Sequence, residues 1–339
     1  MFMERGKERY LLWTGLAFLL SLAVVLFIFR DLDIDELISV LSRAKLFWIL
    51  VLVVLIPIEQ VVRGWKWRQI LYDIRPVPTF RLFAAVVAGY FANMAMPIGI
   101  SPLVRAWLVA RREGLKLPTV LVTTAIERLV DGIVFAGLIG VFVIFGDFPH
   151  VEGKLALGIV VVGVGSLLLF GGILRALFSS RDKLTGGSGY AGRLIGWLEN
   201  RFQALSGFGD GLAMGIVWPR EQKRGAAVLL ASLTMKLISS AHFLWAGLAV
   251  GIVLAPFDYL LILIFASFAG ILSRFVRMPG GFIIGAAFAL SLLGVAEEPA
   301  LAMVVFVHVA SVLTTAGIGA VAFWQSGVKL SNVPIDSPS

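Results

Sequence analysis

Charged side chains inside a long apolar stretch are the residues of this chain best suited to chemistry. Glu127, Arg128 and Asp131 all lie within the apolar run 119–145. On a helix, the i, i+4 spacing puts Glu127 and Asp131 on one face, with Arg128 close by. Charges this deep in a membrane segment need partners. Either the three residues form a self-neutralising structural cluster near the inner end of a span, or Arg128 contributes to an anion site while the carboxylates hold it in place.

Two Pro/Gly breaks interrupt apolar stretches at comparable places in the two halves of the chain. The break residues are Pro97, Gly99 and Pro102 near position 100, and Pro279, Gly280 and Gly281 near position 280. Interrupted hydrophobic segments in corresponding halves point to the binding site of a transporter. The breaks therefore predict a site near the middle of a membrane.

Arginines accompany both breaks and predict that this site binds an anion. Arg105 follows the first break, and Arg274 and Arg277 precede the second. The planar guanidinium group binds phosphate oxygens bidentately and keeps its charge at ordinary pH. Asn93, before the first break, either contacts a headgroup or caps freed backbone groups. In an alternative interpretation, Arg274 and Arg277 merely flank the cytoplasmic end of an ordinary seventh span.

Other polar residues in apolar stretches are interpreted as structural. Lys236, His242 and His308 are isolated, which is typical of packing residues. The segment 63–68, with alternating basic residues and tryptophans, is typical of an anchor at the membrane interface. The chain has no cysteine and only three histidines, so no metal site, cofactor site or catalytic set is predicted.

Composition identifies a polytopic all-α membrane protein. Of the 339 residues, 59% are hydrophobic and only 15% are charged, where a soluble domain carries about 25% charged residues. Several nearly uncharged stretches exceed the roughly 18 residues of a transmembrane helix. The predicted full spans are 11–29, 46–63, 118–145, 154–176, 225–253 and 299–325. In such a protein the net charge of +8 mostly sets orientation and indicates no nucleic-acid partner.

The two interrupted segments, 82–117 and 257–296, are predicted to be re-entrant hairpins. With the N-terminus and C-terminus both inside, most lysines and arginines then face the cytoplasm, as the positive-inside rule requires. The result is a single membrane domain, 1–339, built as an inverted repeat. Its parts are a first half 1–146, a second half 154–325 and a cytoplasmic linker 177–224.

Short motifs in this order resemble a flippase-like membrane family related to the transmembrane region of lysylphosphatidylglycerol synthases. The motifs are Gly89-Tyr90-Phe91-Ala92-Asn93, Pro97, Arg105-Ala106, Glu127 to Asp131, and Pro279-Gly280-Gly281. A hopanoid-associated branch is also similar. The resemblance implies lipid translocation or lipid-linked envelope biosynthesis in a bacterial inner membrane. The soluble aminoacyl-transferase domain of the bifunctional synthases is absent, so lysine transfer is not expected.

Two departures from the family pattern indicate the charge of the expected ligand. Pro102 and the pair Ala286-Ala287 stand where the family usually has a glutamate after each break. Without those carboxylates the site is cationic, which favours an anionic or weakly polar lipid.

The sequence thus predicts a lipid translocator that is not an enzyme and whose partners are membrane lipids and, in addition, envelope-lipid biosynthesis enzymes. Two alternatives stay open. One is an integral-membrane transferase acting on a lipid carrier, with Glu59, Glu127 or Asp131 as its carboxylate. The other is a non-transporting scaffold for envelope enzymes.

Overall fold

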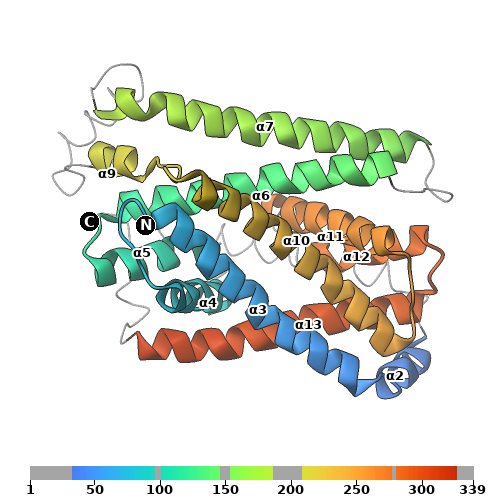
Figure 1. Ribbon diagram of the computed structural model, residues 1–339. Coiled ribbons are helices and arrows are strands. Elements are labelled where there is room, and N and C mark those ends of the chain that lie inside the picture. The colour runs from blue at the N-terminus through green and yellow to red at the C-terminus, as the bar shows by residue number, and fades with distance from the viewer. Residues whose placement is uncertain (1–32, 96–100, 146–152, 186–207, 277–279, 327–339) are drawn as a thin grey trace, which may run out of the picture. The chain divides into compact units, whose positions relative to one another are not determined.

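The computed structural model describes residues 33–95, 101–145, 153–185, 208–276 and 280–326, and every regular element within these ranges is an α-helix (Figure 1). The eleven described helices are α2 (Ile34–Ser42), α3 (Leu46–Leu71), α4 (Thr79–Ala95), α5 (Ser101–Glu113), α6 (Leu117–Phe145), α7 (Gly153–Thr185), α9 (Phe208–Gly215), α10 (Gln222–Val250), α11 (Pro256–Val276), α12 (Gly281–Leu292) and α13 (Glu297–Gln325). The all-α class expected from composition is confirmed.

Six of these helices are long and apolar enough to cross a membrane, which makes this a multi-pass membrane protein. They are Leu46–Leu71, Leu117–Phe145, Gly158–Arg181, Gln222–Val250, Pro256–Ser273 and Glu297–Gln325. Five coincide with predicted spans, while the predicted span 11–29 lies outside the described residues. The sixth differs from expectation, because α11 was expected to be a hairpin arm and yet has the length of a full span.

The described residues fall into two compact units with interleaved segments. The first unit, here the α11–α12 unit, takes the described residues within 1–55, 144–156 and 237–311. The second, the α4–α5 unit, takes those within 56–143, 157–236 and 312–339. The predicted halves, the linker 177–224 and the inverted repeat stay predictions, although α7 and α9 show that parts of the linker range are helical.

Helices α4 and α5 pack against each other around the first break. A side chain at Gly89 would meet the carbonyl oxygen of Ser101 at 2.9 Å and Cβ of Arg105 at 3.2 Å, so the two backbones approach closely here. The 17 residues of α4 extend about 25 Å at helical rise, short of a hydrocarbon core of about 30 Å. This length agrees with a hairpin arm, and the depth of the hairpin in the membrane stays a prediction.

Helices α11 and α12 form the corresponding pair around the second break. Gly280 precedes α12 with φ of 83°, a conformation that favours glycine. Gly281 and Gly285 lie directly against α11, where a Cβ atom at Gly285 would meet the carbonyl oxygen of Phe265. Each break therefore separates two packed helices.

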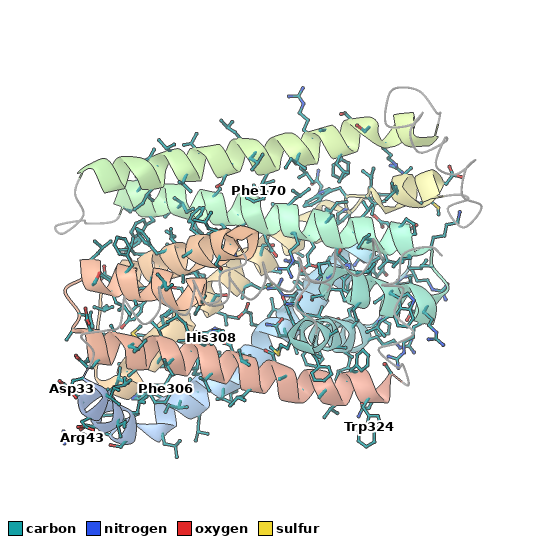
Figure 2. All side chains as sticks on the ribbon, turned by 180° about the vertical axis from the view of Figure 1, so that it is seen from behind. Asp33, Arg43, Phe170, Phe306, His308 and Trp324 are labelled. Carbon is teal, nitrogen blue, oxygen red and sulfur yellow. The ribbon has the colours of Figure 1, made fainter. Side chains whose placement is uncertain are left out.

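Glycines also bring neighbouring helices of the α4–α5 unit together. Gly132 of α6 lies under the ring of Phe170 of α7, and Figure 2 shows this ring between the two helices. Gly319 of α13 lies against Val87 of α4, and the rings of Phe91 and Phe323 are 6.0 Å apart. These contacts fix α6, which carries charged residues described below, and α4, which carries Tyr90.

We expect Gly285→Ala to destabilise the protein by about 1–3 kcal/mol, because the added Cβ forces α12 away from α11. The matched control is Gly137→Ala in α6, where nothing lies within 4 Å of the added atom. This control should be neutral or slightly stabilising, since alanine favours helix over glycine. Thermal unfolding in detergent measures both, and equal midpoints for the two variants would contradict the packing described here.

The predicted orientation is testable because the chain contains no cysteine. We expect Glu297→Cys, at the first residue of α13, to react with a membrane-impermeant maleimide added to intact cells. Glu221→Cys, before α10, should react only after the membrane is permeabilised, because the predicted linker is cytoplasmic. The reverse pattern would overturn the assignment of both termini to the inside.

Candidate functional site

A cluster of charged side chains lies inside the α4–α5 unit. Helix α3 contributes Glu59, Arg63 and Lys66, whose spacing places them on one helical face. Arg105 comes from α5, and Glu127 and Asp131 come from one face of α6. All six are buried, with exposed fractions between 0% and 8%. Six charges removed from solvent in a membrane protein require a complete set of partners.

Glu127 is the centre of this cluster and touches cations from two other helices. Its Oε2 lies 2.8 Å from Nη1 of Arg105, and its Oε1 lies 3.3 Å from Nζ of Lys66. Nη1 of Arg63 is 3.6 Å from the same Oε1. One fully buried carboxylate therefore joins α3, α5 and α6 through ion pairs.

Asp131 and Glu59 complete the set. Lys66 Nζ donates a hydrogen bond of 2.5 Å to Oδ1 of Asp131, and Arg63 Nη1 is 3.7 Å from Oδ2. Arg63 also pairs with Glu59 one turn earlier in α3, at 3.7 Å. Three buried cations thus match three buried carboxylates, so this group is neutral as a whole.

Aromatic rings surround the buried cations. The guanidinium of Arg105 lies 5.1 Å from the ring centroid of Trp67, and that of Arg63 lies 5.9 Å from Tyr90. Trp67 is itself held by a hydrogen bond of 3.0 Å from Nε1 to Oγ1 of Thr123 in α6. Such ring faces stabilise cations electrostatically.

Arg128 differs from the buried cations because its side chain is exposed. Its Nη2 donates a hydrogen bond of 3.2 Å to the hydroxyl oxygen of Tyr90 in α4. Within the described part of the chain, Arg128 makes no ion pair. A guanidinium group has five N–H donors, so most of its donors remain free for a ligand.

Sequence reasoning found part of this cluster and misassigned another part. Arg105, Glu127, Arg128 and Asp131 were predicted, and the structure brings them together. The assignment of the segment 63–68 to an interface anchor is wrong for Arg63, Lys66 and Trp67, which are buried at 7%, 0% and 0% exposure. Their i, i+3, i+4 spacing was the signal that could have separated them from Trp65, which is exposed.

The remaining predicted residues are not joined to this cluster by any described contact. Asn93 is exposed in the last turn of α4, and Pro102 lies half-buried in the first turn of α5. Gly280 precedes α12, Gly281 is its first residue, and Arg274 lies in α11. Pro97, Gly99, Arg277 and Pro279 lie outside the described residues. That Arg274 and Arg277 join Arg105 at one site stays a prediction.

Metal ligands are not gathered anywhere in the described ranges. No group of three or more histidine, aspartate or glutamate side chains there could hold a metal ion. Within the cluster, each of the three carboxylates already faces arginine or lysine.

An all-helical multi-pass architecture with a buried ionic cluster beside a broken helix pair defines the general class of this protein. Residues 14–319 match the family described as the lysylphosphatidylglycerol synthase TM region, and the chain belongs to that family. The resemblance inferred from the motifs is thereby confirmed, while the hopanoid-associated branch stays a prediction.

One curated relative is similar over part of its length. The glycosyltransferase AglD of Haloferax volcanii is 26% identical over 175 residues, which cover 45% of this chain and 28% of that protein. The chain thus spans little more than a quarter of this relative. No solved structure matches the chain.

We expect Glu127→Gln to destabilise the protein by about 3–5 kcal/mol, because three buried cations lose their shared carboxylate. Unfolding midpoints in detergent measure the loss. The matched control is Glu221→Gln, which removes an exposed carboxylate paired with Arg224 and should cost at most about 1 kcal/mol.

A double-mutant cycle tests the pairing itself. Combining Glu127→Gln with Arg105→Gln should cost less than the sum of the two single losses, because residues in direct contact are coupled. Additive losses would contradict the ion pair between these side chains.

Proposed function

We propose that this protein translocates an amphipathic lipid with an anionic headgroup across a bacterial inner membrane. The headgroup binds at Arg128 in the α4–α5 unit, while the acyl or isoprenoid chains remain in the bilayer. Arg274 and Arg277 beside the second break are proposed as further cations along the route. The family and the six long apolar helices support a membrane protein of lipid or envelope metabolism.

The observation that carries this proposal is the exposed, unpaired guanidinium of Arg128 beside a neutral buried cluster. In the described ranges Arg128 donates a hydrogen bond to Tyr90 and has no carboxylate within ion-pair distance. A cation within a membrane-spanning helix is costly unless it faces water, protein or an anion, and Arg128 lies within the span Leu117–Phe145. An anionic headgroup supplies the missing partner.

The buried cluster has a positioning role in this proposal. Arg105, predicted from the sequence to touch the headgroup, is only 1% exposed and is paired with Glu127. Glu127 precedes Arg128 directly in α6, so the ion pairs that fix Glu127 also fix the backbone from which Arg128 extends. Arg105 therefore holds the site and Arg128 contacts the ligand.

A transferase acting on a lipid carrier is the second candidate, favoured by the name of the curated relative, a glycosyltransferase. Such an enzyme needs a free carboxylate as base or metal ligand. Glu127 and Asp131 are engaged by Lys66, Arg63 and Arg105, so they would have to be released from these pairs first. This requirement favours translocation over transfer, and the scaffold alternative predicts no lipid movement at all.

Transport is expected to depend on Arg128. In vesicles containing the purified protein and fluorescent phosphatidylglycerol, Arg128→Gln should slow lipid translocation by about tenfold or more, as expected for a lost charge-assisted hydrogen bond. Arg128→Lys should retain part of the activity because it keeps the charge but loses the fork. A reducing agent that bleaches only outer-leaflet lipid reports the rate.

The matched control is Arg111→Gln in α5, an exposed arginine that lies over Trp107 and outside the cluster. Its translocation rate should equal that of the unchanged protein. Unchanged translocation in Arg128→Gln would sink the site assignment. Formation of a glycosylated lipid from an activated sugar donor would instead favour the transferase.

A further inference from the structure

We propose that Lys236 of α10 is the second cation of the headgroup site and that the site therefore takes a dianionic headgroup, a lipid phosphate monoester or diphosphate. This inference rests on the proposed function and specifies its ligand. Lys236 was interpreted from the sequence as a packing residue.

The charge balance of the α4–α5 unit sets Lys236 apart. Six buried charges cancel, three against three, as described above. Two cations remain beside this neutral group, Arg128 and Lys236, and neither makes an ion pair with any described residue. Each contacts an aromatic residue instead, Tyr90 and Phe135 respectively. The unit thus has two positive charges in excess at this place.

Both excess cations lie along the same face of α6. The Nζ of Lys236 is 4.6 Å from the centroid of the Phe135 ring. Arg128, Asp131 and Phe135 follow the i, i+3, i+7 spacing that places side chains on one helical face. The rise from Arg128 to Phe135 along α6 is about 10 Å. The long side chains of Arg128 and Lys236 can reach toward each other across this distance. Asp131, which lies between them on this face, is itself paired with Lys66 and Arg63, and a single headgroup that contacts both excess cations would lie beside it.

The register of α10 against α3 independently places Lys236 at the level of the buried charged cluster. Arg224, near the start of α10, lies 3.4 Å from the ring centroid of Tyr72 and donates a hydrogen bond of 3.1 Å to Gln69. Figure 1 shows α10 antiparallel to α3. Lys236 lies 12 residues, or about 18 Å, beyond Arg224, and the same distance back along α3 leads to the turn of Glu59.

Two excess positive charges favour a ligand that carries two negative charges. A phosphodiester headgroup carries one negative charge, which leaves one of the two cations without a partner. A phosphate monoester carries about −1.5 to −2 at pH 7 and has three acceptor oxygens. The fork of Arg128 and the single ammonium group of Lys236 together supply donors for three such oxygens.

The test compares two lipids with the same short acyl chains, dioctanoyl phosphatidic acid and dioctanoyl phosphatidylmethanol, which differ in a single methyl group on the phosphate. Binding to the full-length protein in detergent is measured by titration at pH 8. We expect a preference of about tenfold or more for the monoester, equivalent to about 1.4 kcal/mol. At pH 5 the preference should disappear, because a phosphate monoester loses its second charge near pH 6.

Substitution of Lys236 separates this inference from the proposed function. Lys236→Gln should remove the preference while affinity for the diester is kept, and Lys236→Arg should restore it. Lys223→Gln, an exposed lysine at the start of the same helix, is the matched control and should behave as the unchanged protein. Equal affinity of the unchanged protein for both lipids, or a preference that survives in Lys236→Gln, overturns the dianion inference. If the unchanged protein binds neither lipid, the proposed function itself is overturned.

Discussion

The rest of this structure depends on the neutralisation of one carboxylate, that of Glu127. It has no access to solvent, so its charge is tolerated only because Arg105, Lys66 and Arg63 reach it from α5 and α3. Those three contacts determine how α3, α5 and α6 approach one another. They also require Asp131 and Glu59, since three buried cations around one carboxylate would leave two positive charges unpaired. The geometry of the unit thus follows from a requirement of charge balance, which the apolar surroundings make strict.

The same charge balance underlies the proposed function. Once the six buried charges cancel, any further cation beside them must find its partner elsewhere. Arg128 and Lys236 are in that position, on α6 and α10. Their unpaired state is an energetic cost to the folded protein that a bound anion removes. A structural cluster and a ligand site were posed as alternatives for the residues around Glu127. The carboxylates and their partners form the structural cluster, and in the proposed function the two remaining cations bind the ligand.

Each helix break allows the chain to fold back, so that two short helices pack against each other. In the α4–α5 unit, close packing at Gly89 brings Arg105 to α4 directly after the first break. A continuous helix would carry that arginine far from α4, since each turn adds about 5.4 Å. In the α11–α12 unit, Gly281 and Gly285 produce an equally close pair without a described charge cluster. The two breaks thus share a backbone architecture and differ in the side chains they present.

Sequence alone predicts the class of the protein, five of its spans, both helix breaks and four of the charged residues, because these follow from local hydrophobicity, Pro/Gly content and the cost of charge in an apolar run. It did not determine the partners of those charges. Arg63 and Lys66 adjoin Trp65 and Trp67 in a segment typical of an interface, and only the rotation of α3 about its axis decides that Arg63, Lys66 and Trp67 face inward while Trp65 faces out. Lys236 is equally uninformative in isolation, since its significance comes from a neighbour 101 residues away, Phe135. Ion pairing between helices depends on their mutual register and rotation, and these are properties of the tertiary structure alone.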